Sequence, residues 1–493
     1  MGRLADTLIH AGHEVTLFLP ELDPRANKTG SKLATEIRVP GKNPEGFLKA
    51  FTQKSPFEEQ ELMSVSAFKS MFQFMDLMEA ECEHLVTSAP VMDRLRQSKF
   101  DLIIIEMYDY CGFGIAHLLG IPSRIWMSSM PLTEQMSAAL GVPWPTSYIP
   151  GIFTAMSDRM SYSERFKNFI GVNLVVQLTL RTVVSQEQSV FDRNFGADFP
   201  RLWDLAGTTP VVFVNSEELL DFPRPILHKT IYMGGLGMEA PKKLDKNFEA
   251  ILNGSTEGVV LMSFGSIARS VDMPADMKKG ILETFARFPA YTFLWKYEEE
   301  DMEMVKGYKN VKLVKWAPQV DLLGHPKLKA FITHAGYNSM MEAALAGKPM
   351  ITVPLFADQF RNSQASKRQG ISLEVDKTKI GRDESLYEAL NDILSNPEYS
   401  QNAARLSNMI KKKPHKPEEL VVRWVEFAAE FKQLPNLQPT ARDLNVFQYY
   451  CIDIIAPLIF GFILVLYISY RILKFSLCFL IRIVKGPKKS KKD

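Results

Sequence analysis

The sequence predicts an α/β protein built on parallel sheets, and two observations carry this prediction. Short apolar runs alternate with segments of helical periodicity, most regularly over residues 257–375, and strands that alternate with helices form parallel sheets with helices on both faces. A chain of 493 residues with 46% hydrophobic and 23% charged residues has the composition of a globular protein of two or three domains. Its mean hydropathy of -0.07 excludes a protein of many membrane spans.

Other composition data exclude further classes of protein. The formal net charge of +2 argues against a nucleic-acid-binding protein, which usually shows a basic excess, so no nucleic-acid partner is expected. The four cysteines are too few for a disulfide scaffold, and their scattered positions exclude a four-thiolate zinc site.

The predicted elements divide the chain into two domains. In the second half, strands are predicted at 259–263, 291–295, 311–314, 331–333 and 350–353, with helices at 274–288, 338–346 and 359–369. In the first half, strands are predicted at 15–19, 102–105, 123–127 and 211–215, with helical stretches at 57–97 and 158–195. Prolines and glycines around 223–241 predict a linker. We therefore expect domains at 1–235 and 240–430 and a connector at 431–450.

The C-terminus predicts a membrane anchor. Residues 454–470 carry no charge, and extension to Cys451 gives about 20 residues, enough to cross a hydrocarbon core of about 30 Å. Residues 471–493 contain eight Lys or Arg and one acid, so a transmembrane helix at 451–470 and a basic cytosolic tail are expected. Residues 489–493 match the K-x-K-x-x pattern of retrieval to the endoplasmic reticulum. The alternatives are a buried core helix and a basic tail that lies on anionic lipid.

The N-terminus reads as the second half of a β-α-β unit. An amphipathic helix ends near Gly12 and a strand follows at 15–18. No basic and apolar signal peptide precedes them in the sequence, although a C-terminal anchor with a cytosolic tail places residues 1–450 in the lumen. We therefore expect that a signal peptide and a first strand are missing, either through a gene-model error or in a truncated isoform.

Four clusters follow predicted strands at the edge where parallel sheets bind ligands. After strand 259–263, Gly265 allows close backbone approach and Ser266 can donate to a phosphate oxygen. After strand 311–314, the indole of Trp316 can stack on a base and Gln319 can bond its edge. The alternatives are an ordinary glycine–serine turn and a buried core tryptophan.

The third cluster, residues 333–343, follows strand 331–333. A helix is expected to begin near Asn338 or Ser339, and its free N–H groups favour a diphosphate. His334 can add a hydrogen bond, and Glu342, one turn into the helix, can accept from ribose hydroxyls. The alternative is that Asn338 or Ser339 is only a helix N-cap and His334 a structural turn residue.

The fourth cluster follows strand 350–353. Asp358 and Gln359 can accept from and donate to the hydroxyls of a sugar. The alternative is that Asp358 only caps the next helix.

Taken together, residues 316–359, with the runs WAPQ, FITHAGYNS and LFADQ, resemble the nucleotide-sugar signature of the UDP-glycosyltransferases of the UDP-glucuronosyltransferase type. The resemblance extends to FDLIIIEMYDYCGFGIAHLLGIP, the DFPRPILHKTIYMGG linker, the anchor and the dilysine tail. It implies a GT-B fold, in which two Rossmann-like domains face a cleft. The residues that it implies for the UDP-sugar are Ser266, Trp316, Gln319, His334, Gly336, Asn338, Ser339, Glu342, Asp358 and Gln359. The family usually reads T-H-G-G, and Ala335, which replaces the first glycine, should cause only slight crowding.

The resemblance also implies an inverting displacement at C1 of the sugar by a hydroxyl of a small lipophilic acceptor, with no metal or other cofactor. A histidine of the first domain removes the acceptor proton and a carboxylate orients it; Glu106 matches this carboxylate, and Asp109 is its neighbour. The histidine lies in an S-H-x-x-F stretch just before residue 1, so the general base is expected to be missing. His10 and His13 are expected to be surface helix residues.

Two functions remain open. One is a glycosyltransferase of the endoplasmic-reticulum membrane, single-pass with lumenal domains, acting on lipophilic acceptors. The other is a UDP-sugar-binding membrane protein that regulates or pairs with full-length relatives. The sequence does not decide the donor sugar, the acceptor, or between a homo- and a hetero-oligomer.

Overall fold

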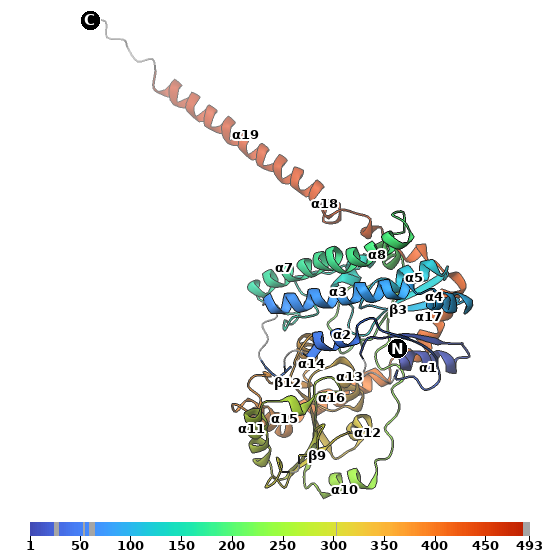
Figure 1. Ribbon diagram of the computed structural model, residues 1–493. Coiled ribbons are helices and arrows are strands. Elements are labelled where there is room, and N and C mark those ends of the chain that lie inside the picture. Colours follow the sequence, from blue (N-terminus) through green and yellow to red (C-terminus); the bar gives the residue numbers. More distant parts are fainter. Residues whose placement is uncertain (24–28, 53–54, 59–64, 302, 487–493) are drawn as a thin grey trace. The chain divides into compact units, whose positions relative to one another are not determined.

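The computed structural model describes residues 1–23, 29–52, 55–58, 65–301 and 303–486 (Figure 1). The chain forms two compact units, Met1–Gln438 and Pro439–Asp493. The K-x-K-x-x motif at 489–493 lies outside the described residues.

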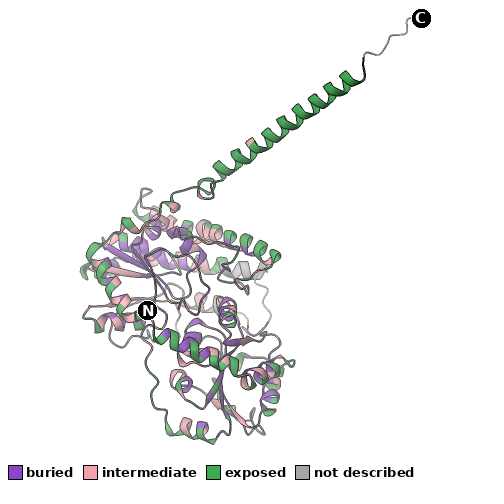
Figure 2. Cartoon of the chain, turned by 180° about the vertical axis from the view of Figure 1, so that it is seen from behind, coloured by how far each residue is buried: buried purple, intermediate pink, exposed green. Residues whose placement is uncertain are grey.

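The first unit contains a four-stranded parallel sheet in its N-terminal half. Its order is β3 (Leu102–Glu106), β4 (Ser123–Ser128), β5 (Val211–Val214) and β6 (Thr230–Tyr232). All residues of β4 and β5 are buried, as expected for strands covered on both faces (Figure 2). A separate parallel pair consists of β1 (Thr16–Glu21) and β2 (Thr35–Pro40).

Side chains that alternate along β4 enter two different cores. Trp126 packs with Phe113 of α5 (Cys111–Leu118) and Phe191 of α8 (Ser185–Phe195). Ile125 and Met127 pack on the other face with α1 (Gly2–His10) and α17 (Pro417–Phe431). Helix α17 thus covers the first sheet although it follows the second sheet in sequence.

A disulfide between Cys82 and Cys111 joins α3 (Val65–Thr87) to the first residue of α5. The composition argument excluded a disulfide scaffold, and it did not anticipate this single bond.

The second sheet has six parallel strands in the order β12-β11-β10-β7-β8-β9. Their bounds are β7 (Gly258–Ser263), β8 (Tyr291–Lys296), β9 (Val311–Val314), β10 (Leu328–Thr333), β11 (Met350–Thr352) and β12 (Ser372–Glu374). The chain runs from β7 outward to β8 and β9, then returns to place β10 on the other side of β7. The boundary between β7 and β10 is therefore the topological switch point, where open sheets of this kind bind ligands.

Helices cover both faces of the second sheet. One face packs against α11 (Ala275–Ala286) and α15 (Ser385–Ser395). The other packs against α10 (Lys246–Gly254), α12 (Gln319–Gly324), α13 (Tyr337–Ala346) and α16 (Pro397–Lys411). The predicted α/β class with parallel sheets is confirmed.

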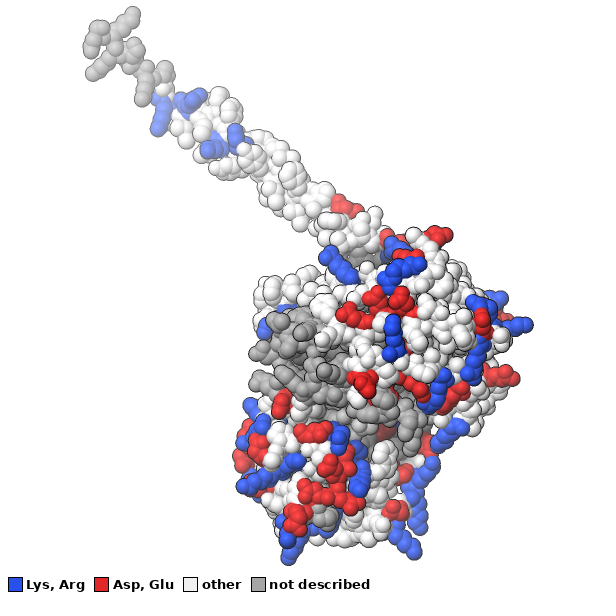
Figure 3. Space-filling view, in the orientation of Figure 1, with Lys and Arg blue, Asp and Glu red and all other residues white. Residues whose placement is uncertain are grey.

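Within the part of the chain that the structure describes, two helices are long and apolar enough to cross a membrane. Helix α19 (Ile452–Val484) is the more apolar of the two and has no buried residue, and Figure 3 shows uncharged side chains along most of it with basic ones near its C-terminal end. It continues past the predicted end at 470 because residues 472–484 are also mostly apolar. The other is α7 (Tyr162–Thr179), which runs through a π-helical turn into α8; its Asn168 is buried and donates to the backbone of Thr146 and Ile149.

Three further predictions concern the linker, the helical stretch at 57–97 and the domain boundaries. The predicted linker at 223–241 contains a strand, β6, so that prediction is wrong over residues 230–232. The helical stretch at 57–97 is α3 and α4 (Ala89–Gln97) within its described residues. The domain boundaries at 235–240 and 430 stay predictions.

Candidate functional site

At the switch point, a histidine ring lies against two glycines. The turn after β7 contains Gly265, with φ +80°, and the exposed Ser266; His334 directly follows β10. A Cβ atom added to Gly265 would lie 2.8 Å from His334 Cε1, and one added to Gly336 would lie 2.4 Å from Nε2. Both positions therefore need glycine. The turns after β7 and β10 therefore meet at the His334 ring, and of the predicted residues His334 and Gly336 follow β10 while Ser266 is the neighbour of Gly265 after β7.

Burial lowers the pKa of His334, a backbone interaction with Ser263 opposes this shift and the positive charge of Lys296 adds to it, so the resulting pKa is about 4. The imidazole is therefore neutral at pH 7. It can donate one hydrogen bond to an anion but brings no full positive charge.

Helix α13 begins one or two residues earlier than predicted. Its first residue is Tyr337, and Gly336 occupies the N-cap position. The alternative that Asn338 or Ser339 is the N-cap is therefore wrong, since both lie in the first turn. A helix start capped by glycine leaves its backbone N–H groups available to an anion. Asn338 is exposed, and its Oδ1 accepts a hydrogen bond from Asn215 Nδ2 at 3.1 Å.

A second set of predicted residues meets between α12 and α13. Gln319 Nε2 donates to Glu342 Oε2 at 2.7 Å and to Ser339 Oγ at 3.1 Å. Arg3 of α1 approaches the other carboxylate oxygen of Glu342 at 3.4 Å. Trp316, three residues before Gln319, is 73% exposed, so the alternative of a buried core tryptophan is wrong.

The fourth cluster lies at the start of α14 (Gln359–Arg368). Asp358 occupies the N-cap position, but its Oδ2 accepts from Asn362 Nδ2 at 2.7 Å rather than from the helix backbone. Burial raises the pKa of Asp358. Gln359 is only 4% exposed, and its Oε1 accepts from the backbone N–H groups of Leu355 and Phe356 at 2.9 and 3.1 Å. Gln359 thus stabilises the turn, which the sequence did not indicate.

Of the two carboxylates at the end of β3, Glu106 is the last residue of the strand and Asp109 follows it. Glu106 Oε1 accepts from the backbone N–H groups of Met107 and Ser129, each at 3.1 Å, while burial raises its pKa. Asp109 Oδ1 accepts from Cys111 N at 3.1 Å; burial raises its pKa to about 6, and the charge of Glu106 adds to the shift.

The two N-terminal histidines differ in their surroundings. His10 is exposed at the end of α1, in agreement with the predicted surface role. His13 follows α1 and is half-buried, and its Nε2 lies 3.3 Å from Glu426 Oε1 of α17, so the prediction of a surface helix residue is wrong for it.

Comparison with known proteins decides the family. Residues 1–489 match the family model described as "UDP-glucoronosyl and UDP-glucosyl transferase". The chain belongs to this UDP-glycosyltransferase family. It is 34% identical to the Caenorhabditis elegans protein ugt-48 (92% of this chain, 88% of that one) and 31% identical to UDP-glucuronosyltransferase 1A1 of Rattus norvegicus (93% and 85%). It is also 30% identical to UDP-glucuronosyltransferase 1A10 of Homo sapiens (97% and 88%).

Solved structures agree in fold. The glycotransferase of kitacinnamycin aligns with a TM-score of 0.55 at 17% identity (88% of this chain, 94% of that one). Os79 from O. sativa, in complex with U2F and trichothecene, aligns with a TM-score of 0.54 at 15% identity (87% and 96%). The expected GT-B fold of this UDP-glycosyltransferase is thereby confirmed. Family membership implies a UDP-sugar donor and an acceptor, and α19 together with the relatives indicates membrane association.

In this UDP-glycosyltransferase, Ala335 replaces the first glycine of the T-H-G-G pattern. The replacement affects the backbone conformation rather than the packing space around the side chain. Ala335 is buried, and its φ of +63° lies in the left-handed region that favours glycine. Its carbonyl accepts from Asn362 Nδ2 at 3.2 Å, which connects the His334 turn to α14.

A lysine side chain that lies beside the His334 turn was not predicted from the sequence. Lys296, the last residue of β8, donates from Nζ to Gly265 O at 2.8 Å and to Glu298 Oε1 at 3.0 Å. Its position at the end of a predicted strand was the signal that could have identified it.

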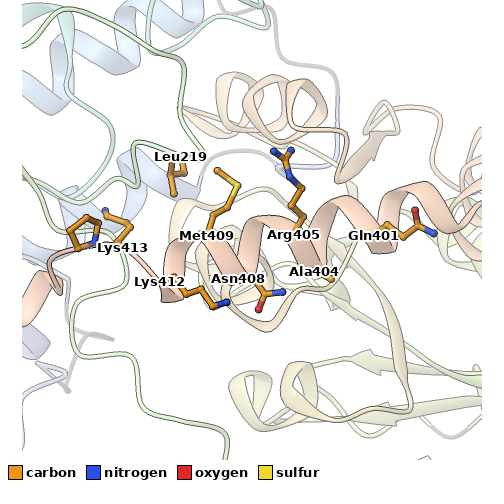
Figure 4. A pocket seen from close by; sticks show the side chains of 9 residues that line it. Leu219, Gln401, Ala404, Arg405, Asn408, Met409, Lys412 and Lys413 are labelled. Atoms are coloured by element: carbon orange, nitrogen blue, oxygen red, sulfur yellow. The ribbon is translucent and has the colours of Figure 1, made fainter.

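A shallow groove of about 820 Å³ lies along α16, away from these clusters (Figure 4). It contains none of the predicted site residues. Its lining is Leu219, Gln401, Ala404, Arg405, Asn408, Met409, Lys412, Lys413 and Pro414.

Proposed function

We propose that the chain transfers a hexosyl group, glucuronosyl or glucosyl, from a UDP-sugar to a hydroxyl of a small lipophilic acceptor. The observation that carries this proposal is the meeting of the Gly265 turn, His334 and the glycine-capped start of α13 at the switch point, with the exposed Ser266 next to Gly265. Helix N–H groups and a neutral histidine suit a diphosphate at this edge of the sheet.

The proposed nucleoside contacts follow from the geometry around Glu342. Trp316 stacks on uracil through its exposed indole, and Gln319 bonds the edge of the base. Glu342 accepts from the ribose hydroxyls, in competition with its present partners Gln319 and Arg3.

The proposed diphosphate and sugar contacts lie along the same edge. His334, Ser266, Gly336, Asn338 and Ser339 bind the diphosphate. Asp358 and the amide N–H₂ of Gln359 bind the sugar, since the carbonyl oxygen of Gln359 is occupied by the turn.

The proposed reaction is an inverting displacement without a metal or other cofactor. The acceptor oxygen forms a bond to C1 of the sugar, the bond from C1 to the diphosphate oxygen breaks, and UDP leaves with the electron pair. The start of α13, the His334 N–H and the nearby charge of Lys296 stabilise the charge that develops on UDP. The acceptor proton passes to a histidine general base, the residue that the family resemblance assigns to the S-H-x-x-F stretch, and Glu106 orients this histidine.

We further propose that the protein is a single-pass protein of the endoplasmic-reticulum membrane with lumenal domains and a cytosolic tail. The Cys82–Cys111 disulfide supports a lumenal location, since disulfides persist in oxidising compartments. Protease added to intact microsomes should remove an epitope on the tail and spare one on the first unit; loss of the latter epitope would refute this orientation.

Calorimetry with UDP tests the nucleotide site. Glu342→Ala and His334→Ala in the full chain should weaken UDP binding roughly tenfold or more, because each removes a hydrogen-bonding group from the proposed site. The exposed residues Glu384 and His415 provide matched controls, and their alanine variants should bind UDP as the wild type does. Unchanged affinity in both site variants would refute the assignment.

Turnover separates the two functions. UDP release with a phenol acceptor should occur with UDP-glucuronate or UDP-glucose. UDP binding without turnover on either donor would instead support a regulatory UDP-sugar-binding protein.

A further inference from the structure

Residues 215–222, which follow β5, form what we call the clamp segment. It is attached to the first sheet, because Asn215 N donates to Ser128 O at 2.8 Å and Asn215 Nδ2 donates to Ser129 O at 2.9 Å. Just beyond it, the Arg224 guanidinium donates to Leu132 O at 2.9 Å and to Ser137 Oγ at 3.0 Å. The segment therefore moves with the first sheet.

The clamp segment contacts the first residue of α13. Glu217 N donates to the phenol oxygen of Tyr337 at 2.6 Å, and Ser216 Oγ lies 2.8 Å from the same oxygen. All three residues are buried, and burial raises the pKa of Tyr337 well above its usual range, so the phenol stays neutral. One hydroxyl thus connects the start of α13 to the first sheet.

The clamp segment also contacts the first turn of α14. Asp221 Oδ1 lies 2.7 Å from Arg361 Nη1, and these side chains are 2% and 1% exposed. The Arg361 guanidinium also lies 5.0 Å from the ring centre of Phe222. Ser216 Oγ lies 3.2 Å from Asp221 Oδ2, so the contacts to α13 and α14 share one network.

We propose that the clamp segment positions the starts of α13 and α14 for the donor, with Tyr337 and Arg361 as positioning residues. This inference rests on the proposed function, which places the diphosphate at the start of α13 and the sugar at the start of α14. Two helix starts that bind one ligand must keep a fixed spacing, and the network connects each of them to the same eight residues, 215–222, which are attached to the first sheet through Asn215. Neither side chain belongs to the predicted donor contacts, so both act through the helices that carry those contacts.

Tyr337→Phe tests the contact to α13 and keeps the aromatic ring. UDP binding to the full chain, measured by calorimetry, should weaken about fivefold to tenfold, because one positioning hydroxyl is lost. Tyr399→Phe is the control: its hydroxyl, near the start of α16, donates to Asp392 Oδ2 of α15 at 2.9 Å and, within the described residues, has no contact with the clamp segment. This control should bind UDP as the wild type does, and the melting temperatures of both variants should fall by similar amounts.

Arg361→Met and Arg361→Lys test the contact to α14. The methionine variant should raise KM for the UDP-sugar about tenfold with the acceptor KM unchanged, and lysine should restore most of the donor KM because it keeps the charge beside Asp221. A role in stability alone would lower the melting temperature of Arg361→Met without changing the donor KM of the folded enzyme.

The results separate this inference from the proposed function. A wild-type chain that fails to bind UDP overturns the proposed function and this inference with it. A wild-type chain that binds UDP, with Tyr337→Phe binding equally well, overturns the clamp alone. Weakened UDP binding in Tyr337→Phe but not in Tyr399→Phe supports it.

Discussion

At the scale of single residues, Ala335 shows how a family glycine can be replaced. An alanine in the left-handed region costs about 1–2 kcal/mol, but burial of its methyl group returns about 0.8 kcal/mol. A glycine at this position would also give the unfolded chain more conformational freedom, which lowers the free energy of unfolding by about 0.4–1 kcal/mol. These terms nearly cancel, so the backbone accepts alanine at the turn that carries His334.

Ala335→Gly should therefore leave the free energy of unfolding within about 1 kcal/mol of the wild type. Ala343→Gly, at a buried position of α13 with helical dihedrals, should cost about 2 kcal/mol from lost helix propensity and burial. Urea unfolding of both variants measures the difference. Equal losses would show that the positive φ of Ala335 carries no strain.

The raised pKa of Asp109 predicts that the free energy of unfolding depends on pH. Its pKa of about 6 in the folded chain lies above its ordinary value of 3.8, so the folded state favours the protonated carboxyl. The resulting stabilisation is complete below pH 3.8 and is lost as the pH rises through about 6. Asp109→Asn should therefore raise the free energy of unfolding by about 3 kcal/mol at pH 8 and by little at pH 4.

Urea unfolding at the two pH values tests this expectation. Asp101→Asn, at an exposed position just before β3, is the control and should show no such difference. A gain for Asp109→Asn that is equal at both pH values would contradict the ionisation argument.

At the scale of elements, the Cys82–Cys111 disulfide closes a loop of 29 residues between α3 and α5. Loop-closure entropy predicts that its removal costs about 3–4 kcal/mol. Cys82→Ser/Cys111→Ser should lower the urea midpoint accordingly, and reductant should have the same effect on the wild type. Cys451→Ser/Cys478→Ser removes the two free thiols of α19 and should leave the midpoint unchanged; a wild type insensitive to reductant would refute the bond.

The elements that could be predicted are those whose signal is local. Strands β7, β8, β10 and β11 are mainly apolar runs because both faces of their sheet are covered. The four donor clusters follow β7, β9, β10 and β11. The prediction that Gln319 and Glu342 belong to one site came from the family resemblance, because the local sequence around each residue alone was weak evidence.

The remaining features depend on partners distant in the sequence. Strand β6 has three residues between prolines and glycines, and only its pairing with β5 reveals it. The roles of Tyr337 and Arg361 depend on residues 215–222, more than 100 positions away. The disulfide follows from the packing of α3 on α5 rather than from any spacing rule.

At the scale of the whole molecule, α19 accounts for membrane attachment. A chain that ends at Gln438, the last residue of the first compact unit, should be released from membranes by alkaline carbonate, whereas the full chain should remain. Removal of residues 487–493 alone is the control and should not release the protein. If the shorter chain stayed on the membrane, α19 could not be its single membrane attachment. The exposed Tyr162, Phe166 and Phe169 of α7 would then be the next candidates for membrane contact.

The disulfide has a practical consequence for producing this enzyme. A host cytoplasm that keeps thiols reduced would deliver polypeptide whose four cysteines all react with a thiol reagent after denaturation, whereas correctly matured polypeptide offers only Cys451 and Cys478. Thiol titration therefore reports the fraction of a preparation that has matured. Because Cys111 lies two residues after Asp109 and its backbone N–H donates to that carboxylate, an unoxidised preparation would also lack the covalent link between α3 and the segment that carries Asp109.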